Sequence, residues 1–308
     1  MNQTLFQLCV VVGGAWLTAG AALLYFTHVR LERPAIGHFN GRDVLVVFVF
    51  LVTLPALYVI LPEAVLTAFL ILTFVSALTI GYRPLLSSTP RWLIIGALLG
   101  ANIAVTRVGL GTVRGWQIYW TLTSIVVLLA VVAVANLYVQ GGMQLRHVAW
   151  FALALAVYDP LFSIVIPLSI ELADRFAGFA LDPSIGMRLG ALNANIGMGD
   201  LLVYSLFTIA AYKAYGPRTL PAVALAITVF GCVIPSIAPE LLGSLHRGNI
   251  GFVVPAQTFF GPVAFLLYLW WRRRGVEAPM SEWLNRATPA ETLPASSKTA
   301  ELVQAVLP

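Results

Sequence analysis

The sequence predicts an all-α membrane protein that crosses the bilayer about nine times. Of its 308 residues, 59% are hydrophobic and only 10% are charged, whereas soluble domains carry about 25% charged residues. The mean hydropathy is +0.89. Most of the apolar segments are close to the roughly 20 residues that a helix needs to cross about 30 Å of hydrocarbon. These observations exclude an ordinary soluble domain.

Nine segments are apolar enough to form transmembrane helices. They cover residues 5–27, 43–61, 63–82, 92–105, 116–139, 147–172, 190–212, 219–242 and 252–271. The fourth is the shortest, because Arg91 and Arg107 bracket only about 15 apolar residues. It predicts either a short span whose arginines reach the interfaces or a re-entrant element.

The chain divides into three predicted parts. Residues 1–142 contain the first five spans and form an N-terminal transmembrane bundle. Residues 143–271 contain the last four spans and the candidate site. Residues 272–308 are polar and rich in Ala, Pro, Thr and Ser, which predicts a mostly disordered tail with a short interfacial helix around 281–287.

The distribution of Arg and Lys predicts the orientation in a cell membrane. With nine spans, eleven of these residues fall on one side: Arg30, Arg33, Arg42, Arg83, Arg91, Arg146, Lys213, Arg218, Arg272, Arg273 and Arg274. Five fall on the other side: Arg107, Arg114, Arg175, Arg188 and Arg247. Because basic residues accumulate in cytoplasmic loops, the N-terminus is expected outside and the C-terminus in the cytoplasm.

The remaining composition argues against nucleic-acid or metal binding. The formal net charge is +5, but the basic residues are spread over many loops, which suits contact with lipid head groups. Cys9 and Cys232 lie within apolar segments and far apart, as buried small hydrophobic residues do. The four histidines lie at span ends or in loops. No metal, cofactor or nucleic-acid partner is therefore expected.

Two aspartates, Asp159 and Asp200, lie within successive predicted spans. An aspartate at the centre of a membrane helix costs about 2.5–3.5 kcal/mol on insertion scales, so such residues are usually functional. At about 1.5 Å per residue, Asp159 is expected about 18 Å from the start of its span and Asp200 about 15 Å from the start of its own. The intervening loop, 173–189, has 17 residues, so the two spans are expected to be antiparallel neighbours with both carboxylates near the midplane.

The residues beside the aspartates favour a site with space around the carboxylates and an unpaired backbone carbonyl. Gly197 and Gly199 remove side chains next to Asp200, which lets another backbone or a substrate come close. Pro160 follows Asp159 and removes a backbone donor, which frees a carbonyl within the span. Two carboxylates in a water-poor site do not both ionise easily, so the pair holds one proton, as in aspartic proteases.

Three short motifs resemble those of the presenilin and signal peptide peptidase family of intramembrane aspartyl proteases. Tyr-Asp at 158–159 and Gly-Met-Gly-Asp at 197–200 are similar to the family's Tyr-Asp and Gly-x-Gly-Asp signatures. The stretch 200–205 resembles its Asp-Phe-x-x-Tyr-Ser. Pro-Ala-Gln at 255–257, at the start of the ninth span, is similar to its Pro-Ala-Leu, with Gln257 in place of the leucine.

The resemblance implies hydrolysis of peptide bonds in or next to transmembrane segments, with Asp159 and Asp200 as the catalytic pair. It implies that Tyr158 contributes a hydroxyl near the pair. Residues that would shape the site or bind substrate are Tyr158, Gly197, Gly199, Pro255, Ala256 and Gln257. The predicted orientation matches signal peptide peptidase, which favours membrane substrates with a cytoplasmic N-terminus (type II). The short 173–189 loop suggests a single-chain enzyme that needs no self-cleavage.

Other functions remain open from the sequence. The aspartates would also suit an ion-coupled transporter, in which they bind protons or sodium ions. Asn193, Asn195 and the carbonyl freed at Pro160 would then serve as further ligands for the cation. Prepilin-type peptidases use Gly-x-Gly-Asp as well, but a lysine usually follows there, whereas 201–203 is Leu-Leu-Val here. A non-catalytic relative that only binds membrane helices is a further alternative.

Overall fold

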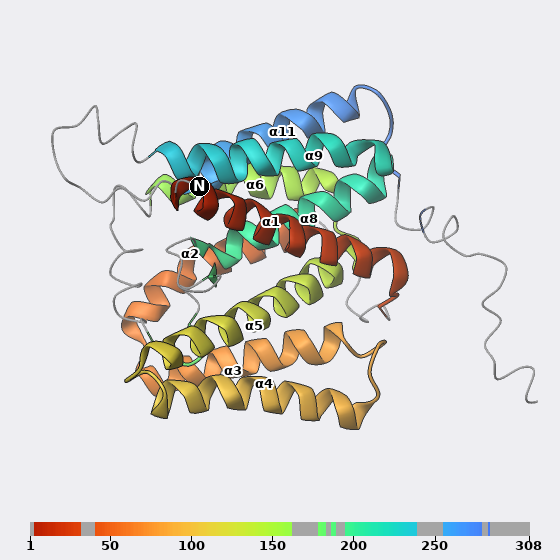
Figure 1. The fold of residues 1–308 in the computed structure, drawn as a ribbon. Coiled ribbons are helices and arrows are strands. Elements are labelled where there is room, and N and C mark those ends of the chain that lie inside the picture. Colours follow the sequence, from red (N-terminus) through yellow and green to blue (C-terminus); the bar gives the residue numbers. More distant parts are fainter. Residues whose placement is uncertain are drawn as a thin grey trace, which may run out of the picture.

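The computed structural model consists mainly of helices that run side by side (Figure 1). The structure describes residues 3–31, 41–161, 178–182, 186–188, 195–238, 255–278 and 283. Within these residues the fold is mainly helical, as the sequence predicts, and it also contains one two-stranded sheet that the sequence does not predict.

The first six helices cover the N-terminal half of the chain. They are α1 (Gln3–His28), α2 (Gly41–Ile60), α3 (Glu63–Gly81), α4 (Ser88–Val108), α5 (Val113–Gln140) and α6 (Leu145–Pro160). The second half contains β1 (Met187–Arg188), β2 (Asn195–Ile196), α8 (Met198–Tyr215), η2 (Pro217–Thr219), α9 (Leu220–Ala226), the π-helical η3 (Ile227–Val233) and α11 (Gln257–Arg272).

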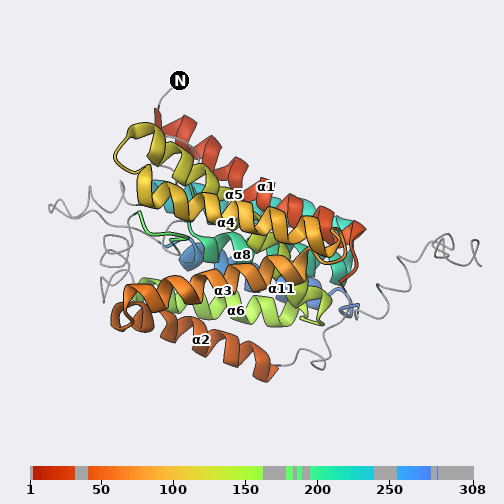
Figure 2. The same ribbon diagram turned by 90° about the horizontal axis from the view of Figure 1, so that it is seen from below.

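The other helices are arranged around α5. It packs against α1 and α8 on one side and against α3 and α4 on the other, as Figures 1 and 2 show. Its most apolar window is 61% buried inside the protein, whereas the corresponding windows of the other candidate spans are 17–33% buried. On the far side of α8, α6 packs along α11, so the three helices that carry the candidate site residues form one group.

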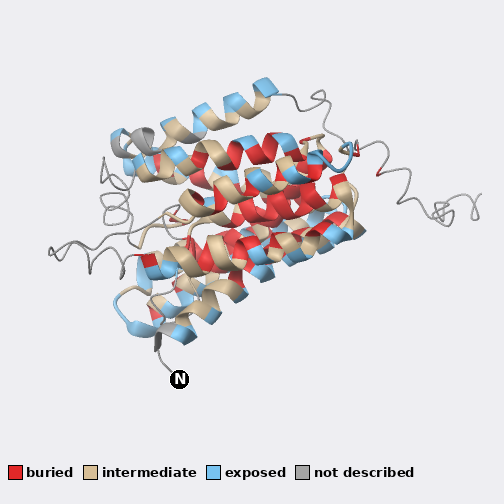
Figure 3. Ribbon diagram, turned by 90° about the horizontal axis from the view of Figure 1, so that it is seen from above, coloured by how far each residue is buried: buried red, intermediate tan, exposed pale blue. Residues whose placement is uncertain are grey.

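The outer surface of the helices is apolar, as expected for a protein in a bilayer. Figure 3 shows that burial is concentrated in the centre of the bundle, while outward faces remain exposed. Large apolar side chains are exposed on α1, α3, α4, α9 and α11, among them Leu24, Leu72, Leu93, Leu225 and Leu266. A soluble protein rarely exposes so continuous an apolar surface. Together with the helix lengths, this indicates a membrane protein.

Five segments of the described residues are long and apolar enough to cross a membrane: Leu5–His28, Glu63–Gly81, Ser88–Val108, Val113–Gln140 and Pro217–Ala238. The third of these corresponds to the short predicted segment 92–105. Its helix, α4, has 21 residues, because Arg91 and Arg107 lie within the helix near its ends rather than outside it. This length favours a crossing helix over a re-entrant element.

Two of the nine predicted spans differ in structure from a single α-helix. The predicted segment 190–212 becomes helical only at Met198, because Asn195–Ile196 pairs as β2 with β1. The segment 219–242 changes from α-helix to π-helix at Ile227. Parts of the predicted spans at 162–172, 190–194, 239–242 and 252–254 lie outside the described residues.

A buried lysine joins the ends of α6, α8 and α11. Lys213, in the last turn of α8, is only 2% exposed. Its Nζ donates a hydrogen bond to the Met143 carbonyl at 2.8 Å and lies 4.0 Å from Oε1 of Glu277. The same Glu277 oxygen accepts the backbone N–H of Leu145, the first residue of α6, at 2.6 Å. A carboxylate is favourable there, because helix N-termini carry unpaired N–H groups.

The chain that follows α11 continues across the bundle. The Ala278 N–H donates to the Ala214 carbonyl at 3.2 Å. Trp283 is buried and packs on Phe26 of α1, with ring centroids 4.4 Å apart, and the Arg30 guanidinium lies 3.8 Å from the Trp283 ring centroid. The beginning of the segment predicted as a tail is therefore part of the fold, and residues 284–308 lie outside the described ones.

We predict that Glu277→Gln lowers the stability of the protein in detergent. The amide keeps an oxygen for the Leu145 N–H but leaves the buried Lys213 ammonium without its carboxylate. An uncompensated buried charge of this kind costs about 1–3 kcal/mol, which thermal unfolding detects as a lower Tm. Glu63→Gln is the matched control, since Glu63 is exposed in the first turn of α3. Equal Tm values for the two variants would contradict this role of Glu277.

Candidate functional site

Asp159 is carried by α6, which lies unusually close to α11. Asp159 is the penultimate residue of α6 and is partly buried. The close approach depends on Gly261 of α11, where a Cβ would stand 2.3 Å from the Ala152 carbonyl oxygen and 2.8 Å from the Ala156 Cβ. The absence of a side chain at Gly261 therefore lets the backbone of α11 touch α6 one to two turns before Asp159.

Asp200 lies in the first turn of α8, so the prediction that it lies mid-way along a helix is wrong. The physical reason is that residues 195–196 form a strand, which pairs antiparallel with β1 through Met187–Ile196 and Arg188–Asn195. Gly197 is then the residue before the helix. The N–H groups of a first helical turn favour negative charge, so this position suits a carboxylate better than a helix interior.

The connection leading to Asp200 is attached to α4 and α5. The Ser124 hydroxyl donates to the Arg188 carbonyl at 2.8 Å and accepts the Arg188 N–H at 3.0 Å. Upstream, the Tyr119 hydroxyl donates to the Phe179 carbonyl at 2.8 Å. The Leu181 N–H donates to Asn102 Oδ1 at 2.9 Å. These bonds fix β1, and through its pairing with β2 they fix the start of α8.

Arg188 adds a side-chain contact at the same place. Its guanidinium lies 4.0 Å from the ring centroid of Trp120 on α5, a cation–π contact. Burial lowers the pKa of Arg188 from its ordinary value, but a guanidinium remains protonated in proteins. The side chain therefore holds a positive charge against the face of α5 that contacts β1, close to the strand that precedes Asp200.

The structure brings Asp159, Asp200 and Gln257 together. The two carboxylates lie close enough to interact electrostatically, across the packed pair α6 and α8. Gln257, the first residue of α11, donates from Nε2 to Asp200 Oδ1 at 2.9 Å. Its side chain is buried, with 1% exposure. The two aspartates predicted from sequence thus lie near each other, and one of them, Asp200, is bonded by the residue that departs from the resembled motif.

Pro255 and Ala256 place Gln257 at this point. Ala256 is the N-cap of α11, and its carbonyl accepts the N–H of Phe260 at 3.1 Å. The Pro255 carbonyl accepts the N–H of Thr258 at 3.2 Å. Because Pro has a fixed φ and no N–H, it is well suited to the residues just before a helix. Among the described residues, Pro255 and Ala256 therefore form the start of α11, which directs the Gln257 side chain to Asp200.

The tyrosine hydroxyls near the aspartates are bonded to the backbone. The Tyr158 hydroxyl donates to the Val52 carbonyl of α2 at 3.3 Å, rather than to an aspartate. Tyr204, fully buried on α8, donates to the Gly231 carbonyl at 2.8 Å. Gly231 lies in the π-helix η3, and a Cβ there would meet the Tyr204 hydroxyl oxygen at 2.7 Å. Both rings therefore connect the site helices to neighbouring elements.

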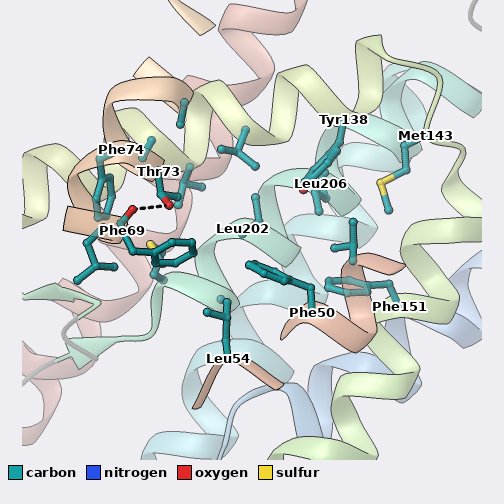
Figure 4. Close-up of a pocket in the computed structure, with 18 of the residues that line it drawn as sticks. Phe50, Leu54, Phe69, Thr73, Phe74, Tyr138, Met143, Phe151, Leu202 and Leu206 are labelled. Carbon is teal, nitrogen blue, oxygen red and sulfur yellow. Dashed lines mark hydrogen bonds between the residues drawn. The ribbon is translucent and has the colours of Figure 1, made fainter. Parts of the chain in front are cut away.

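An apolar cavity of about 410 Å³ reaches the residues beside Asp200. Figure 4 shows side chains from α2, α3, α5, α6 and α8 around it, including Phe50, Phe69 and Leu202. Met198 and Gly199 belong to its lining. A Cβ at Gly199 would meet nothing within 4 Å, whereas one at Gly197 would lie 3.0 Å from Asp200 Oδ2. Gly197 thus leaves room for the Asp200 carboxylate, and Gly199 leaves open space where it borders the cavity.

Sequence reasoning missed several residues that position the site. Ser124, Asn102 and Lys213 act through contacts with segments distant in the chain, and the local sequence around Ser124 and Asn102 carries no signal of these contacts. For Lys213 a weak signal existed, because a lysine within an otherwise apolar span end needs a partner. The described residues contain no group of three or more His, Cys, Asp or Glu side chains that could hold a metal.

The chain matches no known protein family and is not similar to any curated protein. Its function must therefore be argued from the site itself.

We predict opposite outcomes for alanine at two glycines of the site helices. Gly261→Ala forces α11 away from the Ala152 carbonyl and should cost about 1–3 kcal/mol, seen as a lower Tm in detergent. Gly199→Ala places its methyl group in open space and should leave Tm unchanged or slightly raised. A Gly261→Ala variant as stable as the parent would show that α6 and α11 are not packed this closely.

Proposed function

We propose that this protein is an intramembrane aspartic protease of the presenilin and signal peptide peptidase type. The main support is the juxtaposition of Asp159 and Asp200 on the neighbouring helices α6 and α8, beside an apolar cavity. The ordered motifs at 158–159, 197–200 and 255–257 add to it, since all three meet at this place. In this proposal the chain has nine spans, with the N-terminus outside and the C-terminus in the cytoplasm.

The pair would act through water, without a metal or a covalent intermediate. One aspartate is ionised and removes a proton from a water molecule, while the other is protonated and donates to the carbonyl oxygen of the peptide bond. The water oxygen attacks the carbonyl carbon to form a tetrahedral diol. The aspartate that took the proton from water then gives it to the nitrogen, while the other aspartate takes a proton from a hydroxyl of the diol. The C–N bond breaks, an amine and a carboxylic acid are released, and each aspartate regains its starting protonation state.

The cavity supplies the kind of environment that a membrane-embedded substrate needs. Its lining is almost entirely apolar and comes from five helices, so it suits side chains of a transmembrane segment. The substrate must unwind locally, because a peptide bond within a helix has its carbonyl hydrogen-bonded and shielded. The expected partners are therefore transmembrane peptides or membrane proteins, with type II substrates favoured by the proposed orientation.

We predict that Asp159→Asn and Asp200→Asn each abolish cleavage. The assay uses the full chain in proteoliposomes with a type II single-span reporter that carries helix-weakening residues. Neither asparagine can accept or deliver the catalytic proton, so cleavage should fall by at least about a thousandfold, as for loss of an essential acid or base. A hydroxyl-bearing peptide that mimics the tetrahedral diol should inhibit the parent.

Folding controls separate lost chemistry from lost structure. Both variants should keep the parent's Tm and elute as the parent does in detergent. Parent and variants that are folded and equally inactive on several reporters would contradict the protease. Proton or sodium flux in the same vesicles, lost on Asp200→Asn, would then support an ion-coupled transporter instead.

A further inference from the structure

We propose that Gln257 is a positioning residue that holds Asp200 as the ionised member of the pair, so that Asp200 activates the water and Asp159 protonates the scissile carbonyl. This inference rests on the proposed protease activity and assigns the two aspartates their separate roles. Its basis is the asymmetry of their surroundings, in which Asp200 receives a fixed donor at 2.9 Å from Gln257.

The donor is fixed because the amide cannot turn away to solvent. Gln257 is 1% exposed and occupies the first position of α11, which packs along α6 and also contacts α8. A hydrogen bond from an N–H group to a carboxylate stabilises the ionised form, since a protonated carboxyl oxygen is a weaker acceptor. Within a water-poor site this preference is larger than in water.

The position of Asp200 in the fold acts in the same direction. Asp200 lies in the first turn of α8, where unpaired N–H groups and the helix dipole favour negative charge. Asp159 is the penultimate residue of α6 and has no comparable advantage, and none of the described side chains donates a hydrogen bond to it. Of two carboxylates that share one proton, Asp159 is therefore the one that keeps it.

Other titratable groups do not reverse this assignment. Asp200 interacts with Asp159 on α6, with Tyr204 on α8 and with Cys232 on η3. Tyrosine and cysteine are neutral at the acidic pH where carboxyl groups titrate. From α11, the side chain that reaches Asp200 is the neutral amide of Gln257. The only competing charge within the described site is therefore the other aspartate.

The orientation of the amide also leaves a second polar atom in the site. When Nε2 donates to Asp200, Oε1 of Gln257 is buried and has no hydrogen-bond partner among the described residues. A buried acceptor of this kind is suited to a water or a substrate N–H beside the ionised carboxylate. A leucine at this position, as in the resembled motif, offers neither atom.

The test compares Gln257→Met with the parent over a range of pH, using the reporter in proteoliposomes. Methionine keeps the length and approximate volume of the side chain but removes the donor. Because Asp200 would then ionise less readily, the acidic limb of the cleavage profile should move to higher pH by about one unit, the equivalent of one hydrogen bond to a charged group. Thr258→Val, an adjacent change on α11, is the control and should not move the profile.

A uniform loss of activity at every pH, with the acidic limb in place, would overturn the proposal and leave Gln257 as a packing residue. A second readout does not depend on cleavage. In an Asp159→Asn background, infrared titration of the Asp200 carboxyl, whose band is identified by its loss on Asp200→Asn, should show its proton released at higher pH when Gln257→Met is added. If the carboxyl titrates at the same pH in Asp159→Asn with and without Gln257→Met, the role of Gln257 is also overturned, whether or not the parent proves to be a protease.

Discussion

The rest of the site depends on how the protein holds Asp200 within an apolar bundle. A carboxylate there is unfavourable unless hydrogen bonds or helix N–H groups compensate its charge. The fold provides both, because the short strand β2 makes α8 begin just before Asp200 and because α11 begins with Gln257 beside it. The irregular backbone before α8 thus allows the first-turn N–H groups to compensate the charge of Asp200. A continuous helix would have placed Asp200 away from any helix end.

Attachments outside the site restrain both ends of α8, the helix that carries Asp200. Ser124 bonds both backbone groups of Arg188 and so sets the strand that leads into α8. At the other end of α8, Lys213 and Glu277 connect it with the start of α6 and with the chain after α11. These contacts also connect the start of α6 with the chain that follows α11. Small errors of placement matter for a pair of carboxylates that must act together.

The sequence alone predicts the helical membrane fold and the pairing of Asp159 with Asp200, because long apolar segments and isolated carboxylates are local features. It does not predict that α8 begins just before Asp200, since Asn195–Ile196 forms a strand only through pairing with β1. The contact between Gln257 and Asp200 joins positions far apart in the chain and depends on how α11 packs. Lys213 counts as a cytoplasmic charge in the sequence, but in the structure it is buried and compensated by Glu277.

The most direct test of the paired aspartates is photoaffinity labelling of the full chain with a hydroxyl-bearing, transition-state-like peptide that carries a photoreactive group. If the pair forms the reacting centre, mass spectrometry should place the label on α6, α8 or the beginning of α11, and Asp159→Asn or Asp200→Asn should each abolish labelling. Labelling that persists in both variants, or that maps to α3 and α4 away from the pair, would contradict a shared catalytic site.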